Sequence, residues 1–202
     1  MNEDSTSLPI RRLGDKRGRK PITADSAVLY TDLDHTLHRT DAYRTRHGLV
    51  SGSPDTPFFE YAPVLERHLA GYPDVVIALS TAWVQELGFD ETCAKFSTAS
   101  LRERIVDSTY DPHDELTLVW SWVPRGVQIL RHVQRCGVKR WLALDDDSAG
   151  FEGHEARLIH CQREVGLGDA DVQALLARRL ESMFGSPASA STTGASRKGR
   201  LT

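Results

Sequence analysis

The chain has 202 residues, of which 40% are hydrophobic and 26% charged, and its formal net charge is -3. This composition is typical of one globular domain and excludes a fibrous or fully disordered chain. No apolar run reaches the roughly 20 residues of a membrane span, and the amino terminus lacks the apolar segment of a secretion signal. We therefore expect a cytoplasmic protein without a membrane partner.

The three cysteines are Cys93, Cys136 and Cys161. No two of them form a Cys-x-x-Cys pair, which disfavours both a disulfide framework and a thiolate zinc site. Cys136 and Cys161 have apolar neighbours in the sequence, so a packing role is the better interpretation for these two.

The two ends of the chain differ from its middle. Residues 1–24 are rich in Arg and Lys and poor in apolar residues, and residues 186–202 are mostly Ser, Thr, Ala and Gly with three basic residues near the end. We predict disordered tails on both sides of a single domain at 25–185. Basic tails could contact nucleic-acid phosphates, although short basic arms are more often simply solvated.

The most informative segment is 28–37, an apolar run that leads into Asp-Leu-Asp-His-Thr. It predicts a buried strand followed by two carboxylates, Asp32 and Asp34, that face one crevice. Adjacent carboxylates repel each other, and a hard cation between them or a retained proton makes the pair tolerable. The alternative is a polar turn in which Asp34 caps the next helix.

Next in chain order is a polar loop at 39–57 rich in Thr, Arg, Gly, Ser and Pro, and then a predicted helix at 61–69. The apolar run at 74–79 predicts a strand buried on both faces of a parallel sheet, and it stops at Ser80 and Thr81. Residues 99–106 predict another helix. The alternation of Trp120 and Trp122 in 116–123 predicts a strand or an extended lid.

Arg125 lies at the start of a predicted helix with apolar residues at 127, 130 and 133. The next strand, at 140–144, stops at three carboxylates in a row, Asp145, Asp146 and Asp147. A short last strand is predicted at 157–161. An amphipathic closing helix is predicted at 169–184, capped by Asp169 or Asp171.

The order Asp-x-Asp-x-Thr, then Ser, then a basic residue before a helix, then Asp-Asp resembles the four motifs of the haloacid dehalogenase (HAD) superfamily of phosphotransferases. Within it, the segments 79–83 and 141–147 are most similar to small bacterial HAD domains related to those of RNA-repair proteins. The resemblance implies an α/β, HAD-like Rossmannoid three-layer sandwich with a parallel central sheet. The loop at 39–57 lies where many relatives insert a cap domain but is too short to be one, so no large cap is expected.

The same resemblance also implies which residues form the active site. Asp32 would be the nucleophile that forms an aspartyl-phosphate, and Asp34 the general acid and base. Ser80 would donate a hydrogen bond to the phosphoryl group and Arg125 would neutralise its charge. Asp145 and Asp146 would complete a Mg2+ site with Asp32 and the backbone carbonyl of Asp34. Thr36 would have a structural role.

Some assignments stay open at this point. The third-motif basic residue is more often lysine in the superfamily, so Arg131 and Lys139 compete with Arg125, and Thr81 competes with Ser80. His35 is interpreted as a surface histidine without a role, and Asp147 as a solvated carboxylate.

The expected function is a Mg2+-dependent phosphatase that acts on an unidentified phosphorylated substrate, with a macromolecular or nucleic-acid phosphate as one candidate. The alternative is a catalytically silent HAD-fold module that binds or regulates. The sequence does not indicate an oligomeric state.

Overall fold

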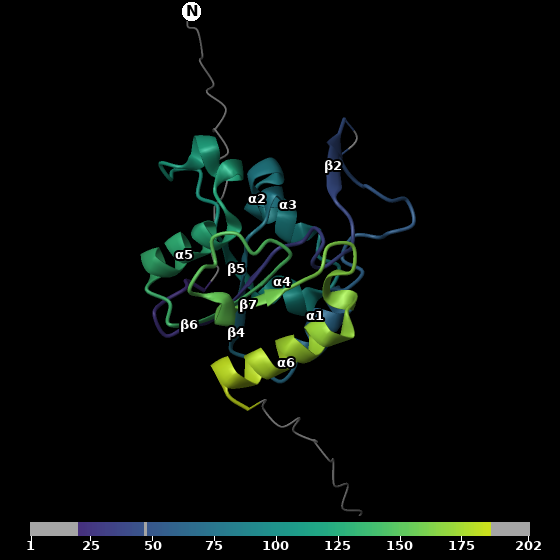
Figure 1. Ribbon diagram of the computed structural model, residues 1–202. Helices are drawn as coiled ribbons and strands as arrows, with labels where there is room; N and C mark the ends of the chain where they lie inside the picture. Colours follow the sequence, from purple (N-terminus) through teal and green to yellow (C-terminus); the bar gives the residue numbers. More distant parts are fainter. Residues whose placement is uncertain (1–19, 47, 187–202) are drawn as a thin grey trace, which may run out of the picture.

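The computed structural model describes residues 20–46 and 48–186, and its centre is a five-stranded parallel sheet (Figure 1). The strand order is β5-β4-β1-β6-β7. The bounds are β1 Ala27–Thr31, β4 Val75–Leu79, β5 Ile105–Ser108, β6 Arg140–Asp145 and β7 Leu158–His160. All residues of β1 are buried, as the continuous apolar run predicted for a central strand. The predicted parallel central sheet is confirmed.

Helices cover both faces of this sheet and make three layers. Alternate residues of the strands point to opposite faces: Leu29 and Ile77 belong to one core cluster, and Tyr30 and Ala78 to the other. The second cluster lies beneath α5 (Arg125–Cys136), and Figure 1 shows α5 on the opposite side of the sheet from α1 and α6. The predicted three-layer sandwich is therefore confirmed.

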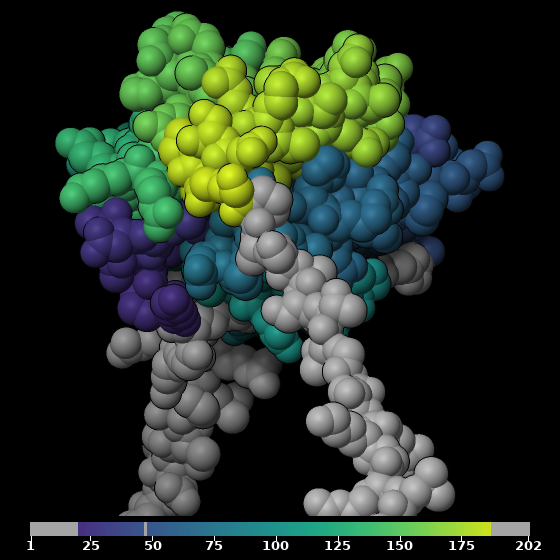
Figure 2. All heavy atoms as spheres, turned by 90° about the horizontal axis from the view of Figure 1, so that it is seen from below, coloured from purple at the N-terminus to yellow at the C-terminus, as the bar shows by residue number. Residues whose placement is uncertain are grey.

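The first cluster lies beneath α1 (Ala62–Leu69) and α6 (Ala170–Phe184), which bury Leu65 and Leu176 against the same side of the sheet. Figure 2 shows the yellow residues of α6 spread over this face beside the blue residues around α1. Both helices were predicted, and Asp169 caps α6 as expected, because its side chain accepts hydrogen bonds from the backbone N–H groups of Asp171 and Val172.

Shorter elements connect the strands. Between β4 and β5 the chain forms three short helices, and single 3-10 turns precede α5, β7 and α6. Their bounds are α2 Ala82–Leu87, α3 Phe89–Ala94, α4 Ala99–Arg104, η1 Thr117–Trp122, η2 Glu155–Arg157 and η3 Gly166–Gly168.

The segment expected to be a loop at 39–57 contains a two-stranded antiparallel hairpin, β2 (Ala42–Thr45) and β3 (Gly48–Ser51). The hairpin stands apart from the central sheet (Figure 1). Arg44 anchors it, donating to the backbone carbonyl of Glu86 in α2 at 2.7 Å. A hairpin of this size is no cap domain, in agreement with the predicted absence of a large cap.

Three local predictions were wrong. The helix expected at 99–106 ends at Arg104, because Ile105 and Val106 begin β5 and pair with β4. The segment expected to be a strand or lid at 116–123 is the 3-10 helix η1, in which Trp120 is buried and Trp122 is 85% exposed. Alternation of two tryptophans does not distinguish a strand from a tight helix whose successive residues also face different ways.

The third wrong prediction concerns one residue on the buried face of α5. Leu130 and Val133 pack against the core beneath the helix, as expected, but Val127 is exposed. The fully buried positions are Gly126, Gln128, Ile129 and His132, two of which are polar, so apolar periodicity predicts this face only in part.

The chain ends are described only in part. Residues 1–19 and 187–202, which hold most of the two predicted tails, lie outside the described residues. Within the first predicted tail, Ile22 is buried in the cluster beneath α5, and the backbone carbonyl of Ala24 accepts a hydrogen bond from Lys139. None of the helices in the described part of the chain has the length and apolar character needed to cross a bilayer.

Candidate active site

Three carboxylates meet where β1 and β6 end. Thr31 is paired with Leu144, so Asp32 and Asp145, one residue further on, lie side by side at the carboxyl edge of the sheet. Oxygens of Asp32, Asp145 and the following Asp146 lie within 4.8 Å of one another. Asp32 is 5% exposed and Asp145 fully buried. Two strands of a parallel sheet thus bring together carboxylates that are more than a hundred residues apart in the sequence.

Burial dominates the electrostatics of this cluster. It raises the pKa of Asp32 to about 6, and Arg125 opposes part of that shift. Burial and then the charge of Asp32 raise the pKa of Asp145 well above its ordinary value. Burial likewise raises the pKa of Asp146. Concentrating three carboxylates here costs free energy unless positive charge compensates it.

Arg125 supplies part of that positive charge. Its Nη2 lies 3.7 Å from Oδ1 of Asp32, and its Nε lies 3.4 Å from Oδ2 of Asp145. Burial alone would lower the pKa of Arg125, but the two carboxylates raise it, so the guanidinium stays charged.

The position of Arg125 depends on a close approach of two backbones. Gly126, in the first turn of α5, donates a hydrogen bond to the carbonyl of Ala149, in the loop after β6. A Cβ at Gly126 would lie 2.2 Å from the backbone carbon of Gly150. Only glycine permits this contact, which brings the start of α5 against the acidic loop.

The two other candidates for the third-motif basic residue lie elsewhere. Arg131 forms ion pairs with Asp114 at 3.2 Å and Glu115 at 3.1 Å, outside the acidic cluster. Lys139 precedes β6 and is exposed at the opposite, amino edge of the sheet. Geometry therefore selects Arg125 among the three.

Sequence reasoning missed a residue that holds Arg125. Gln128 is buried, accepts a hydrogen bond from Nη1 of Arg125 at 3.2 Å, and donates to the carbonyls of Trp120 and Val123. It thereby connects the guanidinium to the 3-10 helix η1. The signal in the sequence was one glutamine on the buried face of an amphipathic helix.

Asp34 is oriented by two N–H donors. Its Oδ1 accepts hydrogen bonds from Nε2 of His38 at 2.9 Å and from Nε1 of Trp83 at 3.1 Å. The His38 ring is buried among aromatic side chains, including Phe58 and Trp83. Asp34 therefore does not serve merely as a helix cap, and its carboxylate is held in one direction within the cavity that it lines.

The two hydroxyl candidates, Ser80 and Thr81, are both buried at the end of β4. The Ser80 backbone N–H donates to the carbonyl of Thr31, and its hydroxyl oxygen lies 3.5 Å from that of Thr109. Thr81 caps α2, accepting a hydrogen bond from the Trp83 backbone at 3.4 Å. Neither residue is among those that line the cavity, so the role of Ser80 stays a prediction.

A cavity of about 300 Å³ opens over the acidic cluster. It is lined by Asp32, Asp34, His35, Asp41, Arg125, Asp146, Asp147 and Arg163. At its mouth Asp41, next to β2, contacts both His35 at 3.1 Å and Arg163 at 3.8 Å, and Arg163 also lies 3.7 Å from Asp146. The base of the hairpin and the loop after β7 thus close one side of the cavity.

The structure corrects the interpretation of His35 as a surface residue. His35 is 6% exposed and lines the cavity, and its φ of 53° lies in the left-handed region where glycine is favoured. The backbone N–H of Glu164 approaches its Nδ1 at 3.4 Å. Asp147 lines the cavity and is exposed, as expected for a solvated carboxylate.

Fold and site together define an HAD-superfamily domain, and the comparison with known families agrees. A family model described as the HAD domain in Swiss Army Knife RNA repair proteins matches residues 28–172. The match covers more than half of the chain, and the chain belongs to this family. No curated protein matches it.

The donor set fits Mg2+, which the superfamily typically binds. Asp32, Asp145 and Asp146 offer only carboxylate oxygens, the ligands that Mg2+ prefers. Asp145 Oδ2 is buried and accepts no hydrogen bond from the described residues, although Arg125 lies nearby. A buried carboxylate oxygen that accepts no hydrogen bond can coordinate a cation instead.

Proposed function

We propose that this domain is a Mg2+-dependent phosphatase that works through an aspartyl-phosphate on Asp32. The observation that carries the proposal is the position of Asp32: it is buried, lines the cavity, lies 3.7 Å from a charged arginine and shares an oxygen cluster with Asp145 and Asp146. A pKa of about 6 leaves Asp32 ionised at neutral pH, and therefore nucleophilic.

The chain's own residues divide the work between two displacements. A carboxylate oxygen of Asp32 attacks phosphorus, the bond to the leaving oxygen breaks, and Asp34 in its acid form gives that oxygen a proton. Asp34 then takes a proton from water, which attacks the phosphoryl group and frees Asp32 with inorganic phosphate. Arg125 offsets the negative charge that develops in both steps. When bound, Mg2+ would neutralise charge on the phosphoryl oxygens.

We further propose that the substrate is a phosphorylated nucleic-acid end. Two observations support it: the family is described from RNA-repair proteins, and the described residues form no large cap that would restrict entry to small esters. Arg163 lines the cavity, is 66% exposed and could contact a backbone phosphate. The exposed Trp122 belongs to η1, which Gln128 connects to Arg125, and offers a surface for base stacking.

The test is phosphate release from p-nitrophenyl phosphate, mononucleotides, and 3'- and 5'-phosphorylated RNA and DNA oligonucleotides, with and without Mg2+. We expect Mg2+-dependent release that is fastest on one oligonucleotide class. Asp32→Asn should abolish it, by at least about a thousandfold. Asp34→Asn should lower it by about 10²- to 10⁴-fold.

Asp147→Asn is the matched control, because it removes an exposed carboxylate from the same cavity, and we expect a much smaller effect. Efficient turnover of small esters alone would contradict the nucleic-acid assignment while leaving the phosphatase intact. Oligonucleotide binding without phosphate release would contradict the phosphatase and favour the alternative, a silent binding module.

A further inference from the structure

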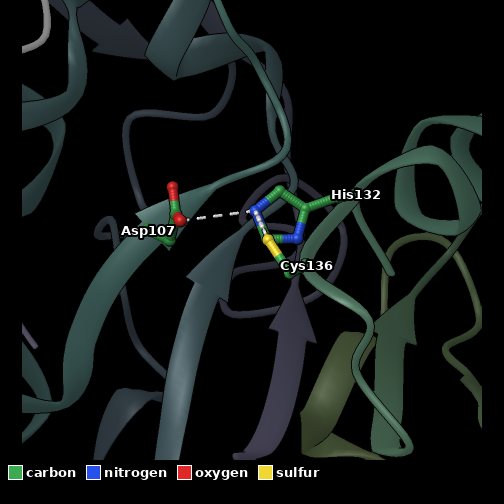
Figure 3. A group of neighbouring side chains, drawn as sticks. All are labelled: Asp107, His132 and Cys136. Carbon is green, nitrogen blue, oxygen red and sulfur yellow. Dashed lines mark hydrogen bonds and ion pairs between the residues drawn. The ribbon is translucent and has the colours of Figure 1, made fainter. Parts of the chain in front are cut away.

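A second group of potential metal ligands lies on the α5 face of the sheet, away from the acidic cluster. Asp107 of β5 and His132 and Cys136 of α5 offer one carboxylate oxygen, one imidazole nitrogen and one sulfur within 4.8 Å of one another. Figure 3 shows the three side chains pointing toward one another, Asp107 from one side and the two helical residues from the other. The proposed phosphatase uses none of them.

The distances among these atoms fit the edges of a tetrahedral zinc site. Nε2 of His132 lies 3.4 Å from Oδ2 of Asp107 and 3.8 Å from Sγ of Cys136. Usual zinc bond lengths give edges of about 3.3 Å for nitrogen to oxygen and about 3.6 Å for nitrogen to sulfur. These two edges differ from the zinc values by only about 0.1–0.2 Å, and the third, between oxygen and sulfur, is at most 4.8 Å.

The contacts of the imidazole distinguish a metal site from a nucleophilic Cys-His-Asp arrangement. In the nucleophilic arrangement the acid orients the histidine through the ring nitrogen that faces away from the cysteine. Here Asp107 and Cys136 both approach Nε2, so three ligand atoms converge on one point. An oxygen, a nitrogen and a sulfur that face one point are arranged as the ligands of a single cation are.

The other imidazole nitrogen is held by a second residue. Nδ1 of His132 lies 2.8 Å from the hydroxyl of Tyr30, a fully buried residue of β1. If Nδ1–H donates to that hydroxyl, the lone pair of Nε2 faces the cation. Metal-bound histidines commonly have such a partner, which fixes the tautomer and the ring orientation.

We propose that Asp107, His132 and Cys136 form a Zn2+ site that joins the edge strand β5 to helix α5. Mixed oxygen, nitrogen and sulfur ligands suit Zn2+ better than Mg2+ or Ca2+. Asp107 and Cys136 are partly exposed, so water can supply the fourth ligand. In the sequence, the absence of a Cys-x-x-Cys pair argued against a zinc site. That argument applies to sites in which several thiolates lie close together. The site proposed here has one cysteine, and its aspartate comes from another element.

Such a site would stabilise the segment that leads to the active site. The chain between Asp107 and α5 contains η1 as its one regular element, and α5 carries Arg125 at its first turn. A metal bond across that segment closes a long loop and reduces its freedom in the unfolded chain.

The experiment is Co2+ and Zn2+ binding to the metal-free full chain in excess Mg2+, which keeps the acidic cluster filled. We expect one Co2+ to give the near-ultraviolet thiolate-to-cobalt charge-transfer band and the visible bands of a four-coordinate ion, and Zn2+ to displace both. Excess Zn2+ should raise Tm by about 5–10 °C. Absence of the thiolate band would overturn the proposal.

The cysteine variants locate the ion. Cys136→Ala should remove the band, while Cys161→Ala and Cys93→Ala should keep it. Cys161 is the stringent control because it lies beside the acidic cluster, where its backbone N–H donates to the carbonyl of Asp145 at 2.8 Å. Loss of the band in Cys161→Ala but not in Cys136→Ala would place the ion at the acidic cluster and refute the site.

A gentler variant keeps the proposal testable if Cys136→Ala does not fold. Tyr30→Phe retains all three ligands and the packing of the ring but removes the hydroxyl beside Nδ1. We expect its affinity for Zn2+ to fall by about tenfold or more. Unchanged affinity in Tyr30→Phe together with unchanged affinity in Asp107→Asn would contradict the proposed ligand set.

Discussion

The floor and the rim of the cavity are built differently. The floor is formed by Asp32, with Asp145 beside it, and both are buried and fixed at the ends of hydrogen-bonded strands. The rim consists of Asp41, at the base of the β2–β3 hairpin, and Arg163, in the loop after β7. The hairpin and η1, which Gln128 connects to Arg125, lie outside the central sheet and expose large side chains such as Tyr43 and Trp122. A sheet fixes the spacing of reacting groups, whereas short elements outside it can change without disturbing that spacing. We expect chemistry to depend on the floor and substrate choice on the rim.

The largest effect that separates the floor from the surface concerns two arginines of α5, Arg125 and Arg131. Arg125→Ala should lower kcat/KM by about 100-fold, because the charge that develops on the phosphoryl group loses its partner. Arg131→Ala is the matched control, since Arg131 pairs with Asp114 and Glu115 outside the cluster. Steady-state kinetics of both variants checks this. Equal losses in the two would contradict the assignment of Arg125.

The floor should also control the pH dependence of stability when metal is absent. The folded state raises the pKa of Asp32 from about 4 to about 6, so it holds a proton more tightly than the unfolded chain between these values. The free energy of unfolding should therefore decrease as pH rises from 4 through 6, by up to about 3 kcal/mol from this group.

Denaturant unfolding in a chelator at pH 5 and pH 7 measures this dependence, and Mg2+ at pH 7 should restore the lost stability. Asp32→Asn should flatten the profile, while Asp147→Asn should keep it. A metal-free protein that became more stable toward pH 7 would show that the carboxylates are compensated in another way.

The smallest effect tests the exposed surface of η1. Trp122→Ala should raise KM for an oligonucleotide phosphate by about tenfold and leave a small ester unaffected, because only the longer substrate reaches a stacking surface outside the cavity. Trp122 is 85% exposed, so stability should hardly change. The control is Trp120→Ala, two residues away and 3% exposed, which should cost about 3 kcal/mol of stability. If Trp122→Ala lowered kcat/KM equally for both substrates, η1 would affect the acidic cluster itself and not only the binding of the longer substrate.

The sequence by itself determined four of the five strands of the sheet and the order in which the polar site residues follow them. Continuous apolar runs that end in Asp32, Ser80 and Asp145 predicted strands and the edge where they end, because a buried parallel strand must be apolar throughout and becomes polar where it surfaces. The same logic missed β5: Ile105 and Val106 follow α4 directly, and no loop or turn residue separates the two elements.

Only the tertiary structure decided which partners these residues have. Arg125 was one of three basic candidates until the contact of Gly126 with the loop after β6 placed it on Asp145. His35 gave no sign of burial in the sequence, and the group of Asp107, His132 and Cys136 joins a strand and a helix that face each other across one core. A sequence pattern records the environment along one element, whereas distances between elements depend on how the layers pack.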